Sequence, residues 1–231
     1  MDAGLLEALR AADTPTVCNA VEVAQGRRGF ARHMRGTPVA SHPRAGALVG
    51  RARTARIRSI MPDGAPVGEV RARRMAYFRH MFDGPRPALA AVQDLDAGAG
   101  AAGAWWGEVH ARVHSAFGLA GAVTDGLMRD LGDLPEGFPI LAGGIGPSHA
   151  FVHVVDFGGE VEVMGLRVAD GEWVHADRHG ALVIPDDVLP GLGAALETLR
   201  RSEAIVLDAA EPGMSWEAFE AAWAGFERAR T

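Results

Sequence analysis

The stretch GAVTDGLMRD, residues 121–130, constrains this chain most. It starts as a short apolar run, typical of a buried strand, and breaks at Asp125-Gly126, a strong turn signal. Arg129 and Asp130 then stand side by side. A rigid strand that ends in a tight turn can hold charged side chains in a cleft. Arg129 could therefore bind an anionic substrate and Asp130 a hard metal cation, with a surface ion pair as the alternative.

The other elements follow from hydrophobic periodicity and from turn residues. Helical spacing predicts helices over 3–12, from Pro15 onward, over 67–82 and, in two stretches, from Asp186 to the C-terminus. Apolar or alternating runs predict strands over 46–60, 88–95, 150–157 and 160–168, and a hairpin over 172–185. The sequence contains no internal repeat and no clear domain boundary.

A second informative segment is GAWWGEVHARVHSAF, residues 103–117, which we interpret as a helix. It follows a strand and the Gly-rich turn 96–100, an arrangement that often binds phosphate or carboxylate groups. Gly107 near the helix start costs ~1 kcal/mol relative to Ala, which indicates that another group approaches the backbone closely. Glu108 follows near the positive end of the helix dipole, where a carboxylate is favoured.

His110 and His114 lie four residues apart, a spacing compatible with two zinc ligands. The metalloprotease signature requires a Glu directly after the first His, and Ala111 occupies that position. Surface or half-buried histidines are therefore the favoured interpretation, and a zinc hydrolase is the alternative.

The chain contains no lysine, because all 23 residues counted as Lys and Arg are Arg. This excludes Schiff-base aldolases, pyridoxal enzymes and P-loop NTPases, all of which need a Lys side chain. Carbanion chemistry on a carbonyl substrate would instead need a metal or another electron sink. A net charge of −6 argues against general nucleic-acid binding. Without a long apolar run or a basic N-terminal leader, we expect no membrane association and a cytoplasmic protein.

The two segments are joined by a fixed spacing. Gly107-Glu108 is followed by twenty residues (109–128), then Arg129-Asp130, two more residues and Asp133. This pattern resembles the RraA-like family, over roughly residues 5–190. It is most similar to the family's enzymatic branch, the class II, metal-dependent 4-hydroxy-4-methyl-2-oxoglutarate aldolases, which also decarboxylate oxaloacetate.

The resemblance implies a role for each matching residue. Asp130 would coordinate Mg²⁺ or Mn²⁺, with waters completing the shell, and Arg129 would bind the carboxylate and keto oxygen of an α-keto acid. The backbone of Gly107, Glu108, Val109 and His110 would cradle the substrate carboxylate. Glu108 would orient a metal-bound water or transfer a proton, and Asp133 would help to hold the metal's waters or Arg129.

The resemblance also implies an α/β sandwich with a central swivelling-type β-structure. We expect an RraA-like domain over 1–190 and a helical C-terminal extension over 191–231 packed on the same domain. The implied protein is a homotrimer or hexamer with its active site between subunits. It would be a carbon–carbon lyase that cleaves a 4-hydroxy-2-oxo acid or oxaloacetate through a metal-stabilised pyruvate enolate. The alternative is a non-catalytic regulatory or protein-binding module on the same scaffold.

Overall fold

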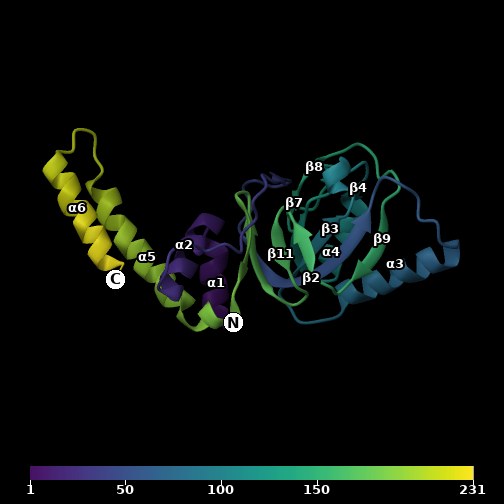
Figure 1. Ribbon diagram of the computed structural model, residues 1–231, viewed down its shortest axis with the longest axis horizontal. Helices are drawn as coiled ribbons and strands as arrows, with labels where there is room; N and C mark the ends of the chain where they lie inside the picture. The colour runs from purple at the N-terminus through teal and green to yellow at the C-terminus, as the bar shows by residue number, and fades with distance from the viewer. Residues whose placement is uncertain (231) are drawn as a thin grey trace.

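The computed structural model describes residues 1–230; residue 231, the end of the expected C-terminal extension, lies outside the described residues. A mixed β-sheet forms the centre of the molecule, with strand order β1-β7-β5-β3-β2-β12-β13, and β9 pairs with the C-terminal half of β2 (Figure 1). Its strands are β1 (Val39–Ala40), β2 (Leu48–Arg58), β3 (Ala88–Asp94), β5 (Leu119–Thr124), β7 (Ile140–Ala142), β9 (His153–Phe157), β12 (Trp173–Asp177) and β13 (Gly180–Ile184). Strands β2, β3, β5 and β7 are parallel, and the remaining pairs are antiparallel. The predicted α/β class is confirmed.

The helices are α1 (Ala3–Ala11), α2 (Thr14–Gln25), α3 (Val67–Phe82), α4 (Glu108–Ala116), α5 (Leu189–Ala209) and α6 (Trp216–Ala229). Helix α2 begins where the sequence predicts, because the Asp13 carboxylate accepts a hydrogen bond from the Thr16 amide and caps the helix. Helices α3 and α4 lie in the connections between β2 and β3 and between β3 and β5. On α3, Tyr77 and Met81 are buried, whereas Met75 is half exposed.

Three apolar clusters hold the layers together. The first packs α3 and α4 against one face of the sheet through Tyr77, Met81, Ala111, Trp106 and neighbouring side chains. The second packs the hairpin β10 (Val161–Val163) and β11 (Leu166–Val168), which turns within the segment predicted as one strand, against the other face. The third packs α1, α2 and the first half of α5 against β12 and β13.

Strand β2 runs through the middle of this arrangement. Its side chains alternate in burial, with Ala52, Thr54 and Ile57 buried, as expected for a strand between two layers. The pairing of β2 with β9 contains a register shift between Arg56 and Ile57.

The helix predicted over 103–117 is only partly confirmed. Residues Ala104–Trp106 form a strand, β4, and the helix starts at Glu108. Both tryptophans are buried, and β4 pairs in parallel with β6 (Leu127–Met128), which in turn pairs with β8 (Gly144–Ile145). These partners, distant in sequence, override the local helical pattern. The Gly-rich turn 96–100 therefore leads through a 3₁₀ turn at Ala97–Ala99 into β4, and its predicted role at the start of a helix is wrong.

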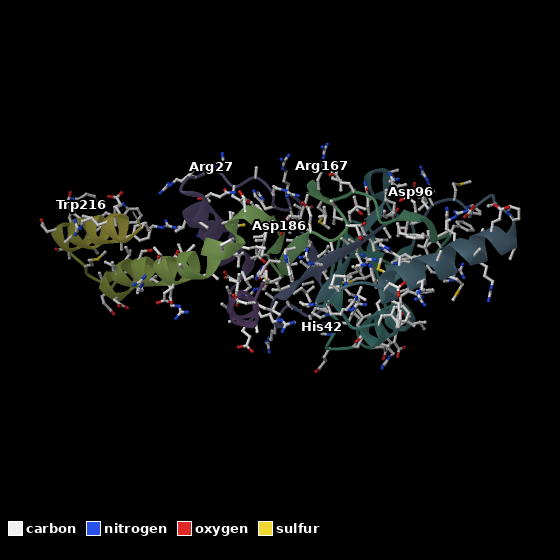
Figure 2. The ribbon with its side chains drawn as sticks, turned by 90° about the horizontal axis from the view of Figure 1, so that it is seen from below. Arg27, His42, Asp96, Arg167, Asp186 and Trp216 are labelled. Atoms are coloured by element: carbon white, nitrogen blue, oxygen red, sulfur yellow. The ribbon has the colours of Figure 1, made fainter. Side chains whose placement is uncertain are left out.

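The C-terminal helices form an arm that projects from the body (Figure 1). The first half of α5 packs on α2 through Leu192, Leu196 and Leu199. Helix α6 lies along α5 and buries none of its residues. Figure 2 shows Trp216 near the tip of this arm, far from Asp96 in the body. In the described part of the chain, no helix is both long and apolar enough to cross a membrane.

Candidate active site

The small parallel sheet β4-β6-β8 brings the two informative segments together. The Arg129 amide continues the pairing of β6 with β4 by donating a hydrogen bond to the Trp106 carbonyl, over 2.8 Å. Consequently the residue before Gly107 and the Arg129-Asp130 pair are adjacent in space, although about twenty residues separate them in sequence. The predicted convergence of Gly107-Glu108 with Arg129-Asp130 is present in the structure.

Gly107 is required by this close approach. A Cβ at this position would lie 2.6 Å from Asp130 Oδ2 and 2.8 Å from Arg129 Nε. The backbone is extended, with φ −143°, so the requirement is steric and not conformational. The expectation that another group approaches the backbone here is confirmed: the approaching groups are the side chains of Arg129 and Asp130.

Asp130 adopts the left-handed conformation, with φ 58°, which is uncommon outside glycine. A turn holds it there, because the Asp130 carbonyl accepts hydrogen bonds from the amides of Asp133 (2.9 Å) and Leu134 (3.1 Å). Strained backbone of this kind is concentrated at binding and catalytic sites. The carboxylate also accepts a hydrogen bond from the Glu108 amide, 3.1 Å from Oδ2, which fixes its direction toward the start of α4.

The start of α4 presents free backbone amides to the same place. Gly107 is the N-cap residue and makes no side-chain cap. Among the described residues, the amides of Val109 and His110 have no hydrogen-bond acceptor, as expected in a first helical turn. The Val109 side chain is 67% exposed beside these amides. An anion at this position would meet amide donors and the positive end of the helix dipole.

The predicted acids differ in their surroundings. The Glu108 side chain is half exposed and pairs with Arg112, one turn along α4, at 2.8 Å. Asp133 is exposed, and within the described chain its carboxylate makes no hydrogen bond to Arg129 or Asp130. Arg129 Nε is buried without a hydrogen-bond acceptor among the described residues, and lies 3.8 Å from Asp130 Oδ2. Arg129 therefore retains an unused donor.

His114 is buried more deeply than predicted, whereas His110 is half-buried, as expected. His114 is fully buried; its Nδ1 donates a hydrogen bond to the His110 carbonyl (2.7 Å), so its Nε2 must accept one from the Tyr77 hydroxyl (2.7 Å). Burial lowers the pKa of His114 to about 4. Burial also lowers the pKa of His110 to about 3, with smaller contributions from the positive charges of His114, Arg74 and Arg129. Both imidazoles are neutral at pH 7.

These contacts argue against the zinc alternative. Both ring nitrogens of His114 are already used in hydrogen bonds, and the described residues contain no group of three or more His, Cys, Asp or Glu side chains placed to hold a metal ion. The donor set fits a hydrated Mg²⁺ or Mn²⁺ better. Such ions keep most of their waters and need only one or two carboxylates, and Asp130 offers an oriented, 37% exposed carboxylate.

Two further features escaped the sequence interpretation. Arg74 is one of the charges that act on His110. It lies one helical turn before Phe78, whose ring contacts His110, and this placement depends on the packing of two helices. Asp94 at the end of β3 is buried, and Asp125, directly after the adjacent strand β5, is half-buried; Asp125 Oδ1 accepts a hydrogen bond from the Asp94 amide. Burial raises the pKa of Asp125 to about 6.

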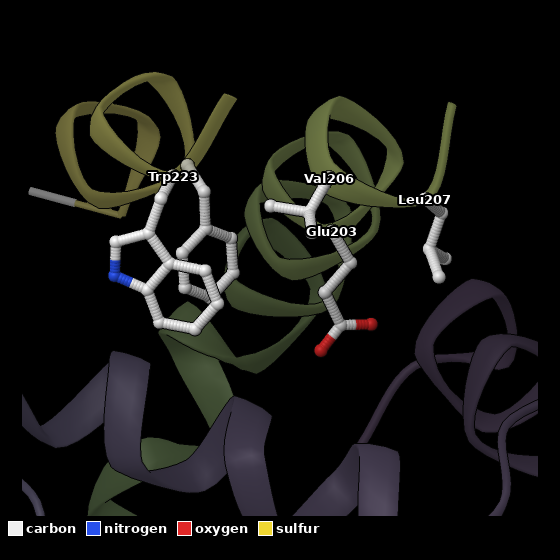
Figure 3. A pocket seen from close by; sticks show the side chains of 5 residues that line it. Glu203, Val206, Leu207 and Trp223 are labelled. Atoms are coloured by element: carbon white, nitrogen blue, oxygen red, sulfur yellow. The ribbon is translucent and has the colours of Figure 1, made fainter. Parts of the chain in front are cut away.

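Two hollows in the described part of the chain lie elsewhere. One, of about 190 Å³, lies between α5 and α6 and is lined by Glu203, Val206, Leu207, Trp223 and Phe226 (Figure 3). Another, of about 480 Å³, lies beside the β10–β11 hairpin and includes Arg32, Arg35 and Arg167 in its lining. Neither hollow includes Arg129 or Asp130. The candidate site is the region around Gly107 where Arg129, Asp130 and the start of α4 come together.

Comparisons with known proteins agree with this architecture. The family model of RraA-like proteins, described as Aldolase/RraA, matches residues 14–183. Streptomyces coelicolor RraAS2, described as an unusual member of the RNase ES inhibitor RraA family, is 23% identical, with a TM-score of 0.63 over 96% of this chain and 97% of its own. An uncharacterized protein from Pseudomonas syringae pv. tomato is 15% identical, with a TM-score of 0.68 over 100% and 98% of the two chains.

A protein from a study of novel cellulases from gut-associated microbes is 17% identical, with a TM-score of 0.70 over 88% and 86% of the two chains. At these identities, the structural matches show a shared fold alone. A search of curated proteins finds no match. The family match covers most of the chain, including Gly107, Arg129 and Asp130, and we conclude that the chain belongs to the RraA-like family.

Proposed function

We propose that this protein is a divalent-metal-dependent carbon–carbon lyase of the class II pyruvate aldolase and oxaloacetate decarboxylase type. The single observation that carries the proposal is the convergence of Arg129, Asp130 and the first turn of α4 around Gly107. This arrangement places a cation, a carboxylate and free amides within one small region. A surface ion pair would need neither the glycine nor the strained backbone at Asp130.

Each group has a distinct role in the proposed reaction. The amides at the start of α4 bind the carboxylate of an α-keto acid. The guanidinium of Arg129 donates hydrogen bonds to the keto oxygen and lowers the free energy of the pyruvate enolate left by cleavage of the carbon–carbon bond. Asp130 would hold Mg²⁺ or Mn²⁺, which supplies Lewis-acid stabilisation of the same negative charge.

The absence of lysine agrees with this chemistry, because a Schiff-base route is unavailable to the chain. Glu108 is the candidate for proton transfer, since its side chain starts beside Asp130 and is half exposed. For this role it must leave Arg112, and an exposed ion pair of this kind contributes only about 0.5 kcal/mol. We propose that Asp133 orients the waters around the metal.

Exposed apolar side chains around the site support an assembly that covers it. Val109 follows Glu108, Leu131 follows Asp130, and Ile145 pairs with Met128 beside Arg129; their side chains are 67%, 44% and 55% exposed. Apolar surface next to a half-open site is typical of an interface. We propose a homotrimer or hexamer in which a neighbouring subunit closes the site.

The direct test is pyruvate release from oxaloacetate and from 4-hydroxy-4-methyl-2-oxoglutarate, measured with Mg²⁺ and with EDTA. We expect activity that requires the metal and falls at least 100-fold in Arg129→Gln, because the lost donor acts on developing charge. Arg200→Gln is the control, because Arg200 is an exposed arginine on the projecting arm, where it pairs with Glu197. Activity that survives both EDTA and Arg129→Gln would refute the proposal.

A second candidate is a non-catalytic, protein-binding module. The projecting arm favours it, because α6 buries none of its residues and Trp216 is 65% exposed. This candidate predicts no lyase activity on any keto acid with either metal. It also predicts that a stable protein complex survives Arg129→Gln and is lost when α6 is removed.

A further inference from the structure

Helix α3 lies alongside α4, and their ring contacts give the register. Phe82 contacts Phe117 with ring centroids 5.5 Å apart. One turn earlier, Phe78 contacts both His114 (5.8 Å) and His110 (5.7 Å). Residues closer to the N-terminus of α3 therefore contact residues closer to the N-terminus of α4, so the two helices run in the same direction. The next turn of α3 carries Arg74 to the level of the start of α4.

Arg74 is exposed, and within the described chain it makes no ion pair or hydrogen bond. It is nevertheless among the positive charges that lower the pKa of His110, where its contribution precedes that of Arg129. Two cations from different elements, Arg74 on α3 and Arg129 after β6, therefore lie within electrostatic reach of one imidazole. Charges closer than about 10 Å interact appreciably at ordinary ionic strength.

Arg129 has an assigned partner in the proposed reaction, and Arg74 has none. Among the described residues, Asp130 is the acid in contact with Arg129, whereas no acid contacts Arg74. His110 is neutral and its Nδ1 is buried without a partner, so it does not compensate either cation. Arg74 is therefore an exposed cation near the start of α4 that no acid of the described chain contacts.

We propose that Arg74 binds the distal carboxylate of a dicarboxylic α-keto acid whose keto-acid end lies on Arg129 and the first turn of α4. Arg74 thereby selects substrates with a carboxylate at each end over those with an apolar end. This inference deepens the proposed function, on which it rests for the position of the keto-acid end. A guanidinium is well suited to the task because it forms paired, charge-assisted hydrogen bonds with carboxylates.

The test uses equilibrium binding, which does not depend on turnover. Calorimetric titration with Mg²⁺ present compares 2-oxoglutarate with 2-oxopentanoate, which carries a methyl group in place of the distal carboxylate. We expect the native protein to bind 2-oxoglutarate roughly tenfold more tightly, as one charge-assisted contact allows. In Arg74→Gln this preference falls to near one while the affinity for 2-oxopentanoate is unchanged.

Arg71→Gln is the matched control, because Arg71 is an exposed arginine of the same helix and is not among the charges that act on His110. It should keep the tenfold preference. A preference that persists in Arg74→Gln overturns the inference, even if pyruvate release is normal and the proposed function holds. A native protein that binds neither ligand, or binds both equally, overturns it too. Selective binding through Arg74 without pyruvate release supports the subsite and contradicts the lyase.

Discussion

Replacing Gly107 with alanine perturbs the site with the smallest possible change. The new Cβ would lie 2.6 Å from Asp130 Oδ2 and 2.8 Å from Arg129 Nε. Ordinary van der Waals contact begins near 3.4 Å, so the carboxylate must retreat by about 0.8 Å (3.4 minus 2.6) and Nε by about 0.6 Å (3.4 minus 2.8). Both groups belong to the proposed catalytic machinery. Misplacement of catalytic groups by about 1 Å typically costs on the order of 100-fold in rate.

We therefore expect Gly107→Ala to lower kcat/KM for pyruvate release on the order of 100-fold, measured with a coupled dehydrogenase assay in saturating Mg²⁺. Gly132→Ala is the control, because nothing lies within 4 Å of a Cβ at that nearby position. Near-ultraviolet circular dichroism checks that the tryptophan environment is retained. A folded Gly107→Ala protein with native kcat/KM would refute the argument that this close approach positions the reacting groups.

The remaining predictions concern His110, His114 and Asp125. Tyr77→Phe leaves His114 Nε2 buried without a donor and should lower the free energy of unfolding in urea by about 1–3 kcal/mol; an unchanged midpoint would show that the hydrogen bond contributes nothing. Folding lowers the pKa of His110 to about 3 and that of His114 to about 4, so the unfolded chain binds more protons than the folded chain below pH 6.5. The free energy of unfolding should therefore decrease as the pH is lowered, by about 1.4 kcal/mol per pH unit for each imidazole. His110→Leu should reduce this slope between pH 6.5 and 4. Asp125→Asn should make the free energy of unfolding decrease more steeply as the pH is lowered, because the raised pKa of Asp125, about 6, favours the folded state at low pH. Slopes that do not differ between the native protein and these variants would contradict the assignments.

The elements that could be predicted from sequence are those whose signals are local. Asp13 indicates the start of α2, and the alternation of apolar and polar residues from Ala52 to Ile57 indicates β2. The resemblance carried by Gly107-Glu108, Arg129-Asp130 and Asp133 implied one site, and the structure brings Gly107, Arg129 and Asp130 together. Gly107 was informative because the side chains of Arg129 and Asp130 leave no room for a Cβ there, although glycine is also a common N-cap residue.

The features that could not be predicted depend on partners distant in sequence. Trp105 and Trp106 carry a helical pattern, but pairing with Leu127 and Met128 makes them a strand. The sequence places His114 four residues from His110, yet nothing local indicates that the Tyr77 hydroxyl occupies its second nitrogen. The position of Arg74 beside α4 likewise follows from the packing of two helices, which a single sequence does not specify.

The central claim is that Arg129, Asp130 and the start of α4 form one metal-dependent keto-acid site. Its most direct test is a titration of metal-free protein with Mn²⁺ in which bound Mn²⁺ and pyruvate release from oxaloacetate are followed together. We predict that activity rises in step with occupancy of one site per chain, and that Asp130→Asn loses both. Pyruvate release that is unchanged without metal, or Mn²⁺ binding that is unchanged in Asp130→Asn, would contradict this account.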